Sequence, residues 1–304
     1  MSNQLRAHVA LFAINLLYGA NYVVAKGLMP NIIGANGFIL LRVIGAVLLF
    51  WLIFIFRFQK IAKADILSLI FCGLFGVAVN QLFFFNGLML TSPINAPVIM
   101  TTTPIIVLVL SLIFLKEKMR STQIIGVFMG ALGAVLFSLQ NIDGGFATGI
   151  GDLFIFFNAA SYAIYLILVK PLMSKYNALT VITWVFTFGL IFVLSWPFTS
   201  IEFAQVQWNQ IATTNAFRML FVVIGVTFLP YLLQVYAMKT VSPSMASVYI
   251  YLQPILSGAF VYLLFYFGFE DYTRDISMIK LLSAIIIFVG VYLVIKPNKV
   301  VEKI

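Results

Sequence analysis

Amide and phenol side chains recur at helical spacing in two separate segments of the 304-residue sequence. Residues three, four or seven positions apart lie on one face of a helix, so each set would form a single polar stripe. The first set is Asn15, Tyr18 and Tyr22, with Asn21 beside it, and the second is Asn158, Tyr162 and Tyr165. Side chains of these types can line a polar and aromatic cavity that binds a solute.

Further polar groups lie in other apolar segments, and two prolines follow them. The additional candidates for the cavity wall are Gln81, Thr101, Tyr231, Gln234 and Tyr251. A proline removes a backbone hydrogen bond and permits a kink, so Pro104 and Pro254 are predicted hinges. The alternative for any single residue is a hydrogen bond that only joins two packed helices. For the set as a whole we predict a central cavity.

Charged residues are scarce inside the apolar segments. Arg42 lies well within one of them, and either it contacts an anionic group or its side chain extends to the outer membrane surface. All nine acidic residues map to loops or helix ends, so no carboxylate is expected at the membrane centre. Carriers coupled to protons or sodium usually keep a carboxylate there. The pattern therefore favours facilitated diffusion, or coupling through a peripheral group.

The sequence lacks the usual patterns of metal sites and catalytic centres. His8 is the only histidine and Cys72 the only cysteine, which argues against a metal cluster or a Ser-His-Asp triad. No HExxH, GxSxG or Walker motif occurs. We expect no cofactor and no enzymatic activity.

The elements that must position these residues are membrane helices. Hydrophobic residues make up 63% of the chain and charged residues 9%, which is too little charge to cover a soluble protein. The apolar runs are continuous and about twenty residues long, which predicts helices rather than the strands of a β-barrel. We predict an all-α polytopic membrane protein with ten spans, at 8–27, 35–56, 65–90, 93–115, 122–139, 151–172, 179–198, 215–238, 243–267 and 278–295.

Lysine and arginine residues concentrate in alternate loops, at 57–63, 116–120 and 170–175, and in the C-terminal segment 296–303. The positive-inside rule then places both termini in the cytoplasm. The same bias accounts for the net charge of +9, so no nucleic-acid partner is expected. The expected partners are a small-molecule solute and membrane lipid, and the sequence leaves the oligomeric state open.

Two gapless matches indicate an internal repeat. Residues 92–96 match 242–246, a register in which the two hinge prolines coincide, and residues 18–26 align with 162–170. Both matches occur in the same order within their halves, which indicates duplication.

The predicted units are 8–140 and 151–296, with five helices each. Because five is an odd number, the second unit must cross the membrane in the opposite orientation. This inverted-repeat architecture is common among secondary transporters, whose binding site lies between the repeats near the midplane.

Glycines form a stripe of small residues in the predicted helix at 122–139. Gly126, Gly130 and Gly133 lie on one face, and Gly290 lies in the last predicted helix. Close packing within the fold is favoured over a dimer contact as the reason for these glycines.

In their order and spacing, these segments resemble the EamA branch of the drug/metabolite transporter superfamily. The resemblance rests on 17–22 with Lys26, 92–104, 115–126, 161–163 and 242–254, and it covers residues 8–296. The family usually has tryptophan where Tyr18 and Tyr162 stand. The resemblance implies an exporter of amino acids or related small metabolites in the bacterial cytoplasmic membrane.

We therefore expect a carrier that moves a small organic solute by alternating access. The alternative is a non-transporting membrane receptor or scaffold, although the loops are too short to form a soluble binding domain. Flux of solutes in proteoliposomes separates the two.

Overall fold

The computed structural model describes residues 3–93, 95–138, 146–267 and 278–296, and within these ranges it contains helices, turns and no β-strand. Helical residues occur in every one of the ten predicted segments. The helices are α1 (Asn3–Leu28), α2 (Ala35–Phe54), α3 (Ile66–Gly73), α4 (Val79–Leu90), α5 (Asn95–Ile99), α6 (Thr103–Phe114), α7 (Ser121–Ser138), α8 (Phe146–Met173), α9 (Ala178–Ser195), α10 (Pro197–Ala204), α11 (Thr213–Phe221), α12 (Leu229–Ala237), α13 (Pro243–Val248), α14 (Gln253–Tyr266) and α15 (Met278–Ile295).

Several helices cross the bundle with an interruption part-way. Leu74–Ala78 is a π-helical turn that joins α3 to α4, and Val222–Phe228 is a π-helical turn that joins α11 to α12. A π turn shifts the hydrogen-bonding register of the helix, and such turns frequently occur at functional sites.

Two more helices are interrupted by 3₁₀ turns. Met100–Thr102 joins α5 to α6, and Tyr249–Leu252 joins α13 to α14. Pro104 and Pro254 each take one of the first two positions of the helix that follows. Proline is tolerated there because an N–H group at the start of a helix has no intrahelical acceptor. Both predicted hinge prolines therefore begin a new helical stretch.

Eight helical segments of the described chain are long and apolar enough to cross a membrane. Ser121–Gly133 and Ile285–Val294 are apolar as well but shorter. The protein is thus a multi-pass helical membrane protein.

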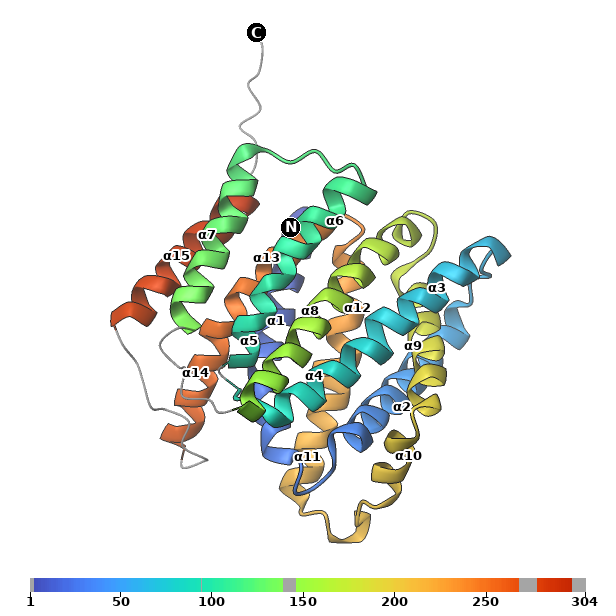
Figure 1. The fold of residues 1–304 in the computed structure, drawn as a ribbon. Coiled ribbons are helices and arrows are strands. Elements are labelled where there is room, and N and C mark those ends of the chain that lie inside the picture. The colour runs from blue at the N-terminus through green and yellow to red at the C-terminus, as the bar shows by residue number, and fades with distance from the viewer. Residues whose placement is uncertain (1–2, 94, 139–145, 268–277, 297–304) are drawn as a thin grey trace.

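Helix α1 packs against α12 and α14 (Figure 1). On one side α4 packs along α8, and α2 packs along α9 and α10. At one edge of the bundle, α7 and α15 lie side by side, and α15 ends at the end of the molecule where α1 begins (Figure 1).

The predicted glycine stripe forms the contact between α7 and α15. A Cβ atom added at Gly290 would lie 2.6 Å from the backbone nitrogen of Gly130 and 2.7 Å from the carbonyl oxygen of Gly126. Only glycine permits two helix backbones to approach this closely. The stripe therefore serves packing within the chain.

The short helix α10 falls almost entirely between two predicted segments. Its Glu202 carboxylate accepts hydrogen bonds from the backbone N–H groups of Asn36 and Gly37, at 2.7 and 3.1 Å, and from the Asn36 side chain. The first N–H groups of a helix have no intrahelical partner, and a carboxylate there also complements the helix dipole. Glu202 thereby ties α10 across the beginning of α2.

Candidate functional site

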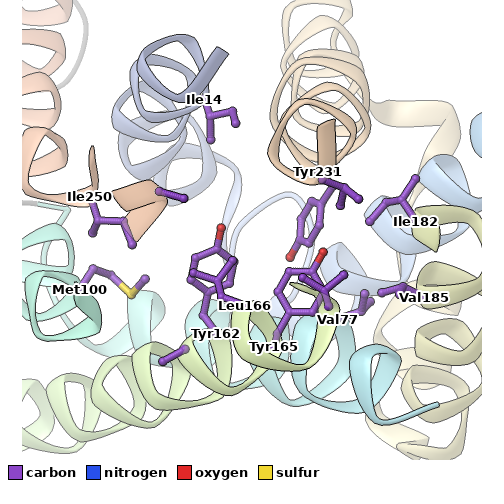
Figure 2. Packing of buried hydrophobic residues seen from close by; sticks show 14 of the residues in the cluster. Ile14, Val77, Met100, Tyr162, Tyr165, Leu166, Ile182, Val185, Tyr231 and Ile250 are labelled. Carbon is purple, nitrogen blue, oxygen red and sulfur yellow. The ribbon is translucent and has the colours of Figure 1, made fainter. Parts of the chain in front are cut away.

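The polar stripes meet in a central cavity between α1, α2, α4, α8 and α12. The cavity leaves about 60 Å³ for the centres of water-sized molecules, several times what a single buried water needs. Its wall consists of Tyr18, Asn21, Tyr22, Arg42, Asn80, Gln81, Phe84, Phe85, Met100, Asn158, Tyr162, Tyr231, Ile250 and Gln253. Figure 2 shows Tyr162 rising from α8 next to Tyr165, with the ring of Tyr231 reaching toward them from α12.

Arg42 is the only positively charged residue in this wall, among the residues that the structure describes. Its side chain is 3% exposed, so it does not extend to the molecular surface. The Nε group donates a hydrogen bond of 2.9 Å to Thr227 Oγ1, and the guanidinium lies 4.3 Å from the ring centroid of Phe85. The buried Nη1 group has no hydrogen-bond partner.

The described acidic residues all find partners away from the cavity. Asp65 pairs with Lys175, Glu117 accepts from Ser244, Asp152 accepts from Thr91, and Glu202 accepts from Asn36. The 2.6 Å hydrogen bond to Asp65 raises the pKa of the Lys175 ammonium above its ordinary value. Asp143, Glu270, Asp271, Asp275 and Glu302 lie outside the described residues.

Several amide atoms of the wall also lack partners. These are Asn21 Oδ1, Asn158 Oδ1 and Gln81 Oε1. Buried polar atoms are nearly always satisfied by hydrogen bonds, and each exception needs an explanation. Atoms that face a cavity can be satisfied by a bound solute or by water.

The π turn at Leu74–Ala78 helps to place the aromatic residues. Ser161 Oγ donates to the Phe75 carbonyl at 2.6 Å, and Tyr231 OH donates to the Gly76 carbonyl at 2.9 Å. Side chains from other helices thus satisfy carbonyls within the interrupted segment. The Tyr231 ring is consequently held at the cavity wall.

A second, smaller cavity lies toward the N-terminal half of α1. It leaves about 10 Å³ for the centres of water-sized molecules, roughly enough for one water. Its wall consists of Ile14, Asn15, Tyr18, Tyr162, Leu166, Gln234, Ala246, Ser247 and Ile250. Tyr18, Tyr162 and Ile250 therefore border both cavities. We call this second space the inner cavity.

Comparison with known proteins identifies the family of this chain. Residues 5–139 and 149–296 match the EamA-like transporter family. The chain belongs to the EamA-like transporter family. The match confirms the resemblance to the drug/metabolite transporter superfamily that the sequence motifs indicate, and the protein is a membrane transporter.

Relatives of this EamA-like transporter cover most of its length. The uncharacterized transporter YetK of Bacillus subtilis (strain 168) is 25% identical over 267 residues, which is 85% of this chain and 80% of YetK. An uncharacterized transporter of Archaeoglobus fulgidus is 22% identical and covers 95% of this chain and 96% of its own length. A solved crystal structure matches with a TM-score of 0.71 at 18% identity, over 95% of this chain and 96% of that one, and so shares the fold.

Most of the residues predicted for the site of this EamA-like transporter lie at one of the two cavities. The central cavity is bordered by Tyr18, Asn21, Tyr22, Arg42, Gln81, Asn158, Tyr162 and Tyr231. The inner cavity is bordered by Asn15 and Gln234. A chain of hydrogen bonds connects the two regions, since Tyr22 OH donates to Gln253 Oε1 and Gln253 Nε2 donates to Asn15 Oδ1, each at 2.7 Å.

Three predicted residues border neither cavity and lie between packed helices. Thr101 Oγ1 donates to the carbonyl of Val98 within its own helix. Tyr251 OH donates to the Val127 carbonyl at 2.8 Å, and its ring lies against Gly130. Tyr165 is fully buried with its ring against Gly76, and its hydroxyl has no partner.

The predicted set for this EamA-like transporter omits six residues of the central wall. They are Asn80, Phe84, Phe85, Met100, Ile250 and Gln253. The two amides carry the same signal as their predicted neighbours, because a polar side chain inside a span is unusual. The four apolar residues carry no such signal, since lipid-facing positions use the same residue types.

Proposed function

We propose that the protein exports a small metabolite, such as an amino acid, across the bacterial cytoplasmic membrane by alternating access. The observation that carries the proposal is the polar cavity at the centre of the bundle, separated from the inner cavity by side chains that border both. A path of this kind lets one space open while the other stays closed.

We further propose ten spans arranged as two inverted five-helix repeats, 8–140 and 151–296, with both termini in the cytoplasm. A pair of lysines supports the duplication. Lys26 Nζ donates to the carbonyls of Leu88, Met89 and Thr91 at 2.8 to 2.9 Å. Its repeat counterpart Lys170 donates to the carbonyls of Met238 and Val241, the counterparts of Leu88 and Thr91 in the 92–242 register, at 2.6 and 2.8 Å.

The interruptions of the helices support the same duplication. A π turn precedes α4 and another precedes α12, while a 3₁₀ turn precedes both α6 and α14, each of which has a proline in its first turn. The counterparts of central-wall residues also border the inner cavity, since Tyr22 corresponds to Leu166 and Met100 to Ile250. If the two repeats exchanged conformations, the inner cavity would enlarge and the central cavity would close.

Flux in proteoliposomes tests the transport proposal. A metabolite-toxicity screen with the protein overexpressed selects the solutes, and efflux of each is then measured from liposomes. Tyr18→Ala and Tyr162→Ala should each lower efflux at least about tenfold, because each removes a ring that contacts both cavities. Tyr266→Ala, at a position 77% exposed in α14, is the matched control and should leave efflux unchanged. Absence of flux for every solute would favour the receptor or scaffold instead.

Accessibility of single cysteines tests the inverted topology. In a Cys72→Ala background, Gln4→Cys in the first turn of α1 and Gly149→Cys near the start of α8 place thiols at exposed positions. A membrane-impermeant maleimide should label Gly149→Cys in intact cells, and Gln4→Cys only after the cells are permeabilised. Labelling of both positions from the same side would contradict inverted five-helix repeats.

A further inference from the structure

The wall of the central cavity contains a buried cation, the Arg42 guanidinium, and one of its N–H groups has no hydrogen-bond partner. Arg42 is 3% exposed, and its Nη1 group has no partner. Among the described residues, no Asp or Glu borders the cavity. Burying an unpaired charge is costly, so ionisable groups inside membrane proteins usually face a partner or a water-filled path.

The surroundings stabilise the guanidinium only in part. The ring of Phe85 lies 4.3 Å below it and the ring of Phe38 lies 5.8 Å away, which gives cation–π attraction but no neutralising charge. Thr227 accepts the Nε hydrogen bond at 2.9 Å. A structural arginine would be expected to use its remaining N–H groups as well, since a buried guanidinium normally satisfies its fork of donors.

Thr227 orients the arginine. Its hydroxyl donates to the Val222 carbonyl at 2.8 Å, so its oxygen is free to accept from Arg42. Val222 and Thr227 both belong to the π turn Val222–Phe228, and Thr227 is fully buried. The π turn therefore fixes the direction in which the guanidinium points, with Nε used and Nη1 available.

The unpartnered amides in the same wall complement the arginine. Asn21 Oδ1, Asn158 Oδ1 and Gln81 Oε1 are free acceptors. Acceptors suit hydroxyl or amino substituents of a solute, while Nη1 suits an oxyanion.

We infer that the transported solute is a small organic acid with hydrogen-bond donors, and that Arg42 binds its carboxylate. Thr227 acts as a positioning residue for Arg42. The inference rests on the proposed function, because it names the substrate class of the same cavity. It predicts that the primary amide of an accepted acid, which lacks the negative charge of the carboxylate, is rejected.

Binding is measured apart from transport, as the melting temperature of the full-length protein in detergent. The probes are matched pairs of an acid and its primary amide: L-threonine with L-threoninamide, L-lactate with lactamide, and phenylacetate with phenylacetamide. At least one acid should raise the melting temperature of the wild type more than its amide does. Arg42→Gln should weaken binding of that acid at least about tenfold, and Arg42→Lys should weaken it less because the charge is kept.

The Thr227 variants distinguish positioning from a purely structural role. Thr227→Val should weaken acid binding while leaving the melting temperature without probe within a few degrees. Thr227→Ser should restore binding because it keeps the hydroxyl. Equal stabilisation by acids and amides, or binding unaffected by Arg42→Gln in a monodisperse variant, would overturn the inference.

Efflux of the same pairs separates this inference from the proposed function. Efflux of acids and amides alike would support the proposed transport but would contradict the inference that Arg42 recognises a carboxylate. A preference for phosphorylated probes over every carboxylate would overturn the carboxylate while keeping an oxyanion at Arg42. Acid-specific stabilisation without any efflux would keep the binding inference and overturn transport.

Discussion

Replacing Gly290 by valine should destabilise the protein by about 3 kcal/mol, because the new side chain would overlap backbone atoms of α7. The nearest atoms to a Cβ at this position are the nitrogen of Gly130 at 2.6 Å and the oxygen of Gly126 at 2.7 Å. Backbone atoms inside a helix cannot move away as a flexible side chain can. The two helices must therefore separate, which removes much of the contact between α7 and α15. Thermal unfolding and the monodisperse fraction in detergent measure the effect.

Gly149→Val is the matched control. A Cβ at Gly149 meets nothing within 4 Å, so this variant should unfold at nearly the wild-type temperature. Equal melting temperatures for the two variants would show that the glycine contact contributes little. Gly290→Ala should give an intermediate loss, since even a methyl group overlaps the Gly130 nitrogen.

Replacing Lys170 by methionine should also cost about 3 kcal/mol, since two hydrogen bonds from a charged donor are lost. The ammonium donates to the carbonyls of Met238 and Val241, which follow the end of α12. The last carbonyls of a helix lack intrahelical partners, and a cation there complements the helix dipole. Methionine keeps most of the length of the apolar stem and supplies no hydrogen-bond donor. Unfolding in detergent is again the measurement.

Lys239→Met serves as the control for Lys170→Met. Lys239 is exposed and follows Met238 directly in the sequence. Its replacement therefore removes one positive charge near this helix end without breaking the hydrogen bonds of Lys170. A comparable loss in both variants would point to net charge rather than to the carbonyl contacts. Lys26→Met should behave like Lys170→Met, because the Lys26 ammonium contacts three carbonyls of its own repeat, those of Leu88, Met89 and Thr91.

Helical periodicity was sufficient to predict much of the candidate site. Polar residues are rare in these spans, so their spacing marks the face that leaves the lipid, and Tyr18, Tyr22 and Tyr162 indeed border the central cavity. The sequence allows two interpretations of Arg42, because sequence spacing does not show how far a long side chain reaches. The hydrogen bond to Thr227, a residue 185 positions away, settles its direction.

The rest of the wall depends on tertiary packing. Phe84, Phe85 and Met100 are common in lipid-facing positions as well, so no pattern separates the two roles. Tyr251 is the opposite case, a polar residue predicted for the cavity wall that does not border either cavity. Its hydroxyl donates to the Val127 carbonyl on α7 instead. The Tyr251 ring packs against Gly130, and this contact between distant segments is not visible in the sequence pattern.

The π turns could not be predicted either. The residues at Leu74–Ala78 and Val222–Phe228 are mostly apolar, with one glycine in each segment and Thr227 in the second, and nothing in their types requires an extra residue in the turn. The turns depend on distant partners, such as Tyr231 for the Gly76 carbonyl. Helix α10 was missed because its eight residues are too few to resemble a span.

The shared wall of the two cavities limits how many solute molecules the path can hold. Tyr18 and Tyr162 border both spaces, and the inner cavity has room for roughly one water. In this conformation two solutes cannot lie one behind the other, and only one of the two cavities is large at a time, so each turnover should carry a single molecule. Solute that accumulates on the receiving side then competes for the same ring-lined chamber. If the protein works as the exporter proposed above, net efflux should accordingly slow as solute builds up outside, which is a form of trans-inhibition.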